Sequence, residues 1–152
     1  MTNLDQAIVA VQTARQCCDL PVYVCCTFFG NTMADGTHPA TASTALTRAG
    51  ASAVEVNCGT NPKTALLAFR QMAAASPAAR IFKPSAGLPD PSGCYPYTPP
   101  MLVPIIQQAI AAGALKGLLI GVIGPGVNNI GAAAVQVVHH FALYHSPQNG
   151  VA

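Results

Sequence analysis

The chain has 152 residues, enough for about one ordinary domain, and 51% of them are hydrophobic, so it can bury a substantial core. Only 8% of the residues are charged, against roughly 25% in an average soluble protein, so part of the apolar surface is expected to meet a partner. A net charge of +2 gives neither the basic patch that nucleic acid requires nor an acidic tail, which disfavours nucleic-acid binding.

Segments that would target the chain to a membrane or out of the cell are not recognised. Residues 1–19 carry polar side chains inside their apolar pattern and lack the uninterrupted apolar core of a signal peptide. The most lipid-like stretch, residues 115–127, is interrupted by Lys116, Gly124, Pro125 and Gly126, and it falls well short of about 20 spanning residues. The six cysteines include two adjacent pairs and no CxxC spacing. These features predict a cytoplasmic protein with no membrane segment.

Short β-rich runs alternate along the chain with longer alanine-rich helical patterns, and proline and glycine mark the boundaries. Three helix starts combine a capping residue with a proline, at Thr37-His38-Pro39, Asn61-Pro62 and Thr98-Pro99. Pro104 weakens the helical pattern in the first turns of the last of these helices. In chain order the predicted elements are a helix over 4–18, a strand over 22–28, a helix from 39 to the closing Gly50, a strand over 53–58, a helix over 63–75, a strand over 80–83, a helix from 99 to Gly113, a strand over 115–124 and a helix over 130–144.

One helix followed by four βα units predicts an α/β protein with a parallel sheet covered by helices. The sheet is either a small open sheet or part of a (β/α)₈ barrel, and two observations favour the barrel. A complete barrel takes about 250 residues, so this chain is close to half of one. Half a barrel also leaves two open strand edges beside exposed apolar interior, which fits the expected partner.

Three phrases carry a resemblance to a known family. They are Val56-Asn57-Cys58, then Lys83-Pro84-Ser85-Ala86-Gly87-Leu88-Pro89, then Gly93-Cys94-Tyr95-Pro96-Tyr97-Thr98-Pro99. In this order and at these distances, they resemble the homocysteine S-methyltransferase family, whose members are (β/α)₈ barrels. The similarity extends from about residue 4 to residue 140. It implies that residues 1–145 form the C-terminal half of such a barrel, strands five to eight, with 146–152 as a tail.

The family transfers a methyl group to the sulfur of homocysteine, and a zinc ion held by three cysteines makes that sulfur a thiolate. The resemblance places the first zinc ligand at Cys58 and the other two at Val122 and Ile123, which cannot bind a metal. One thiolate would not hold the ion usefully. Cys58 is therefore either a surviving metal ligand or, as we favour, a small inert residue at a strand end. A zinc site rebuilt from Cys25, Cys58 and either Cys94 or His38 is a further alternative.

Barrel enzymes bind substrates at the carboxyl ends of their strands. Glu55, the only glutamate, either lines the cavity, where it would receive a substrate amine, or pairs with Lys83 on the next strand. We favour the ion pair because a lone buried carboxylate is costly. Ser85 replaces an asparagine of the family phrase, whereas Gly87, which shapes the same loop, is kept. The candidate pocket residues are Thr27, Glu55, Asn57, Lys83, Ser85 and Gly87.

Two functions from different classes follow. The first is a homocysteine S-methyltransferase-like half-barrel for a small thiol amino acid, whose activity is lost or depends on a partner, so that its being an enzyme stays open. The alternative is a non-catalytic binding or assembly module, or one subunit of a split barrel, which pairs with itself or with a complementary half-barrel chain.

Overall fold

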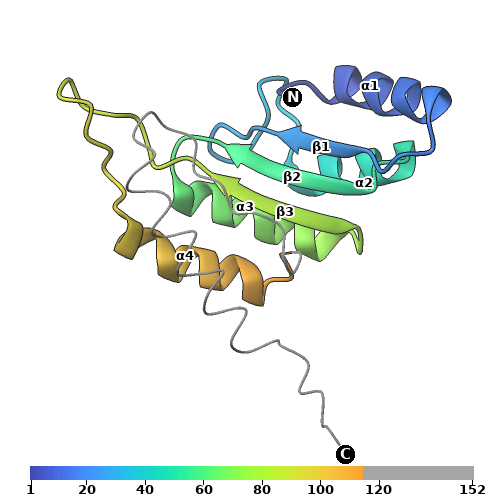
Figure 1. Cartoon of the computed structure of the whole chain (residues 1–152). Helices are drawn as coiled ribbons and strands as arrows, with labels where there is room; N and C mark the ends of the chain where they lie inside the picture. Colours follow the sequence, from blue (N-terminus) through green and yellow to red (C-terminus); the bar gives the residue numbers. More distant parts are fainter. Residues whose placement is uncertain (115–152) are drawn as a thin grey trace, which may run out of the picture.

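The computed structural model describes residues 1–114 of the chain. Its elements are α1 (Leu4–Cys17), β1 (Tyr23–Cys26), α2 (Pro39–Ala49), β2 (Ala53–Cys58), α3 (Pro62–Ala75), β3 (Ala79–Pro84) and α4 (Pro99–Ala111) (Figure 1). The predicted α/β alternation is confirmed over this part. The strand predicted over 115–124, the helix predicted over 130–144 and the tail lie outside the described residues.

The three strands form one parallel sheet in the order β1-β2-β3, so each strand lies beside the next one in the chain. The helices follow the same order, because α1 packs on α2, α2 on α3 and α3 on α4. After each strand, the chain therefore crosses over to a helix on the same face of the sheet and returns to the next parallel strand (Figure 1). This part of the chain is a singly wound α/β layer with all of its helices on one face.

Local capping signals set the helix boundaries. The Asn3 side chain accepts a hydrogen bond from the backbone N–H of Gln6 at the start of α1. Asn61 accepts from two backbone N–H groups at the start of α3, where Pro62 takes the first helical position. Gly50 closes α2 with φ 106°, a left-handed conformation that glycine adopts at little cost.

One predicted strand is shorter in the structure, and one predicted weak point of a helix is not seen. The first strand covers Tyr23–Cys26 rather than 22–28, because the chain turns out of the sheet after Cys26 and Phe29 bridges back to Thr32. The last described helix runs from Pro99 through Pro104 without interruption. Pro104 is the sixth residue of α4 and lacks a backbone N–H, so the helix loses one hydrogen bond there but continues to Ala111.

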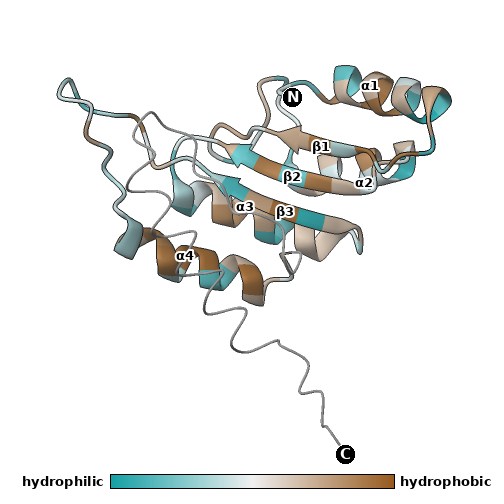
Figure 2. Cartoon of the chain, viewed as in Figure 1, coloured by the Kyte–Doolittle hydropathy of each residue, from teal (hydrophilic) through white to brown (hydrophobic). Residues whose placement is uncertain are grey.

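The main core lies between the sheet and the helices. Alternate strand residues, among them Val24, Val54, Val56 and Phe82, point toward the helix layer and are buried there. The ring of Phe69 on α3 meets the ring of Phe82 edge to face, with centroids 5.4 Å apart. Figure 2 shows the resulting alternation of brown and pale or teal segments along the strands.

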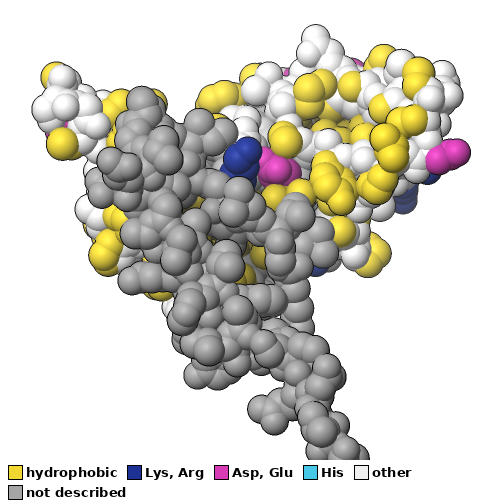
Figure 3. All heavy atoms as spheres, in the orientation of Figure 1, with side chains coloured by type: hydrophobic (Ala, Val, Ile, Leu, Met, Phe, Trp, Pro, Cys, Tyr) yellow, Lys and Arg dark blue, Asp and Glu magenta, His cyan; other side chains and the backbone are white. Residues whose placement is uncertain are grey.

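The other face of the sheet carries no helix among the described elements. The intervening strand residues, such as Tyr23, Cys25, Glu55 and Lys83, occupy this helix-free face. Figure 3 looks onto it and shows a basic and an acidic side chain next to each other in this view, with hydrophobic atoms over the neighbouring described surface. None of the described helices is long and apolar enough to cross a membrane.

Candidate functional site

The loops that follow the three strands meet at the carboxyl edge of the sheet. Gly59 has φ 84°, and a Cβ atom on it would lie only 3.0 Å from the backbone oxygen of Phe28. The Ser85 hydroxyl donates a hydrogen bond to the backbone oxygen of Gly59 (3.4 Å) and accepts one from the backbone N–H of Gly87 (3.3 Å). Gly59 thus lets the loop after β2 lie close to the loop after β1, and the Ser85 hydroxyl joins it to the loop after β3.

Cys58 ends β2 and is the only described residue other than glycine with a positive φ, 59°. Its thiol is free and half-buried. A side chain in this left-handed region costs about 1–2 kcal/mol, and such strain is concentrated at functional sites. The strained turn at Cys58 and Gly59 lets the chain leave β2 sharply at the edge where the three loops meet.

Two oxygen acceptors without partners lie on the helix-free face of β2. Glu55 is only 7% exposed, yet its Oε1 atom accepts no hydrogen bond. The Oδ1 atom of half-buried Asn57 is likewise buried and without a partner. The two residues are two positions apart on a strand, so their side chains point to the same face. The face therefore presents two adjacent acceptors whose hydrogen-bonding capacity is unused.

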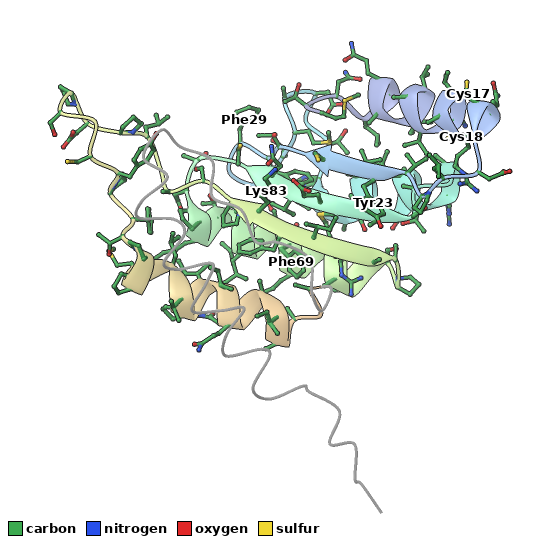
Figure 4. All side chains as sticks on the ribbon, in the orientation of Figure 1. Cys17, Cys18, Tyr23, Phe29, Phe69 and Lys83 are labelled. Carbon is green, nitrogen blue, oxygen red and sulfur yellow. The ribbon has the colours of Figure 1, made fainter. Side chains whose placement is uncertain are left out.

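The predicted ion pair between Glu55 and Lys83 is not formed in the described part of the chain, where Glu55 Oε1 stays unpaired. The strand register explains the difference. Lys83 lies opposite Asn57, whereas the residue opposite Glu55 on β3 is Ile81. Lys83 thus lies two residues from the position opposite Glu55 and directly opposite Asn57. Figure 4 shows Lys83 near the carboxyl end of β3.

Cys25 lies opposite Glu55 on β1. Burial raises the pKa of the Cys25 thiol, and the negative charge of Glu55 and a hydrogen bond to it raise the pKa further. The positive charges of Lys83 and of the N-terminal ammonium act in the opposite direction. These charges surround Cys25 without making it a ready thiolate.

The remaining predicted site residues have structural roles in the described chain. The backbone N–H of half-buried Thr27 donates to the oxygen of Met1 (2.9 Å). Gly87 is buried with φ 90°, and a Cβ atom on it would come within 2.6 Å of the Pro96 ring. The structure brings Glu55, Asn57 and Lys83 together on one face. Gly87, in contrast, is packed against Pro96 inside the loop after β3.

All six cysteines of the sequence fall within residues 1–114 and are free thiols. No three His, Cys, Asp or Glu side chains of those residues form a group that could hold a metal ion. Cys25 and Cys58 have opposite parity in the paired strands, since Cys25 faces Glu55 and Cys58 lies beside Pro84. The rebuilt site of Cys25 and Cys58 with Cys94 or His38 is therefore not assembled there. Val122 and Ile123 lie outside the described residues.

Met1 is a contact that sequence reasoning missed. Its ammonium group donates to the backbone oxygen of Cys25 (2.6 Å), and its own oxygen accepts from Thr27. This pattern is that of one residue of a parallel ladder on the outer edge of β1. No residue type signals such a contact, because the backbone alone makes it.

The described part of the chain is thus an α/β layer with a parallel three-stranded sheet and with polar side chains and loop contacts at the carboxyl ends of its strands. The family model described as homocysteine S-methyltransferase matches residues 1–131. The chain therefore belongs to the homocysteine S-methyltransferase family. Comparison with curated proteins gives no match.

Proposed function

We propose that this chain is the C-terminal half of a homocysteine S-methyltransferase-type barrel and binds a small thiol amino acid at the carboxyl ends of β1, β2 and β3. The observation that carries the proposal is the family match over residues 1–131, together with the placement of the family-like Asn57-Cys58 phrase at that edge. The sequential strand order and the single helix layer also fit a barrel segment.

The donor set of this chain does not fit the family's zinc ion. One half-buried thiol, Cys58, stands at a ligand position, and by the resemblance Val122 and Ile123 stand at the other two. Zinc sites use sulfur, nitrogen or carboxylate oxygen, and an aliphatic side chain offers none. Zinc therefore has no part in the function proposed for this chain. We propose instead that the chain alone binds the thiol amino acid and that methyl transfer requires a partner chain to complete the site.

The test is native mass spectrometry of protein purified without chelator, followed by calorimetric titration with L-homocysteine under reducing conditions. The proposal expects homocysteine to bind to metal-free protein. Zinc at one per chain would contradict the zinc-free site, and absence of homocysteine binding would contradict the proposed substrate. The control variant Cys17→Ser, at an exposed thiol on α1, is expected to bind as the wild type does.

A second function, assembly with another half-barrel chain, is favoured by the outer edge of β1. Within residues 1–114 this edge is bonded by Met1 alone, and Tyr23 beside it is 54% exposed. Unpaired edges with apolar neighbours favour strand pairing. The same native spectra give the subunit count. A dimer that Tyr23→Lys dissociates would support this function, and a monomer at every concentration would contradict it.

We further propose a cytoplasmic location for the protein. The six free cysteines, two pairs of them adjacent in sequence, support a reducing compartment.

A further inference from the structure

We infer that the helix-free face of β2 is the receptor for the charged end of an α-amino acid, with Glu55 and Asn57 receiving the ammonium group and Lys83 the carboxylate. The inference rests on the proposed function and deepens it, because it assigns ligand groups to residues. Its basis is the juxtaposition of two free acceptors and one cation at the carboxyl end of β2 and β3.

The first observation is the unused acceptor of Glu55. Its side chain is more than nine-tenths buried, and Oε1 has no partner among the described residues. Burial of a carboxylate oxygen without a hydrogen-bond donor is costly, and an unsatisfied buried atom in a native fold calls for an explanation. A ligand donor that arrives at this position removes the cost.

The second observation is that Asn57 offers another unpaired acceptor, Oδ1, on the same face. Two positions along a strand span about 6.6 Å, a separation that the two side chains can close around one small group. An ammonium group carries three N–H donors and no acceptor, so it can serve both oxygens at once. A hydroxyl, with one donor, could serve only one of them.

The third observation is the cation next to this pair. Lys83 lies directly opposite Asn57 and is half-buried. The charges of Glu55 and Lys83 sum to zero, as do those of an α-amino acid. The ammonium group of such a ligand can pair with Glu55 and its carboxylate with Lys83. A divalent cation is a poorer match, because no three potential ligands gather among residues 1–114 and Lys83 would repel it.

The experiment compares three thiols that share one carbon chain: L-homocysteine, 4-mercaptobutanoate, which lacks the amine, and 3-mercaptopropylamine, which lacks the carboxylate. Hydrogen bonds to charged groups correspond to about a tenfold to hundredfold change in affinity, so the wild type is expected to prefer homocysteine by about that factor over each. Glu55→Gln is expected to lose the preference for the amine, and Lys83→Met the preference for the carboxylate. Lys63→Met, at an exposed lysine on α3, is the matched control and keeps both preferences.

The outcomes separate the inference from the proposed function. If homocysteine binds but Glu55→Gln still rejects 4-mercaptobutanoate as strongly as the wild type, the inference is overturned and the function stands. If the wild type binds L-2-aminobutanoate, which has no sulfur, as tightly as homocysteine, the inference stands and the thiol specificity fails.

A stability measurement covers the case in which a variant folds poorly. Because Glu55 Oε1 has no partner to lose, Glu55→Gln is expected to leave the urea midpoint of the ligand-free protein unchanged or higher. A clearly lower midpoint would mean that Oε1 already has an intramolecular partner in addition to the Cys25 bond of the side chain, and it would overturn the inference.

Discussion

Replacement of Gly87 by alanine tests how the loop after β3 is built. Gly87 has φ 90°, where any residue with a Cβ atom costs about 1–2 kcal/mol. The new Cβ would also lie 2.6 Å from Cγ and 3.2 Å from Cδ of Pro96, and a proline ring cannot rotate away. Forcing atoms into a packed site costs about 1–3 kcal/mol more. We expect Gly87→Ala to destabilise the fold by about 3 kcal/mol.

Gly93 provides the matched control in the same loop. It has φ 84°, but nothing lies within 4 Å of a Cβ atom built on it, so Gly93→Ala bears only the backbone cost of about 1 kcal/mol. In thermal unfolding followed by far-UV circular dichroism, the difference of about 2 kcal/mol should lower the midpoint of Gly87→Ala by about 6 °C more than that of Gly93→Ala. Equal midpoints would refute the close packing of Gly87 on Pro96. Adding Pro96→Ala should recover part of the loss only in the Gly87 variant.

Three further predictions concern the core, a helix cap and a thiol. Phe69→Ala removes a fully buried ring that packs against another, so urea unfolding should show a loss of about 3–5 kcal/mol, whereas Leu67→Ala, at a 56% exposed position on the same helix, should change stability by less than about 0.5 kcal/mol. Asn61→Ala removes both side-chain bonds at the start of α3 and should cost about 1 kcal/mol in the same assay, and no loss would mean that the cap does not form in solution. Burial raises the pKa of Cys26 from 9.0 to about 12, so the thiol ionises first in the unfolded chain and the free energy of unfolding should fall as pH rises from about 9 to 12. The free energy of unfolding of Cys26→Ala should fall less steeply over that window. Parallel curves for the variant and the wild type would contradict the burial.

The helix boundaries could be predicted because their signals are local. A capping residue before proline satisfies backbone N–H groups within the next three residues, and no distant contact is needed to set the start of α3 at Pro62. The bounds of β2, Ala53–Cys58, also agree with the sequence, because its alternating apolar residues stand between a closing glycine and a cap. The predicted end of β1 was wrong because its signal is not local. Whether Thr27 continues the strand depends on pairing with distant residues, and it bonds to Met1 instead.

The candidate site was predicted in composition but not in contacts. Thr27, Glu55, Asn57, Lys83 and Ser85 do lie in or just after the strands at their carboxyl ends. Which of them touch depends on the register of β2 against β3, and no local pattern fixes that register. A register shift of two residues separates a Glu55–Lys83 pair from the observed Asn57–Lys83 neighbours.

This register also determines the chemistry of the face. Had Lys83 lain opposite Glu55, the two charges would have neutralised each other and the strand end would offer little to a ligand. In the observed register, Lys83 stands beside Asn57, and an acceptor of Glu55 remains free in a buried position. A protein stabilised only by its own contacts would gain by replacing such a carboxylate with an apolar residue. The buried charge is explained if the missing partner of Oε1 is part of a ligand, so Glu55→Gln should weaken binding of the amino acid without lowering the stability of the ligand-free protein.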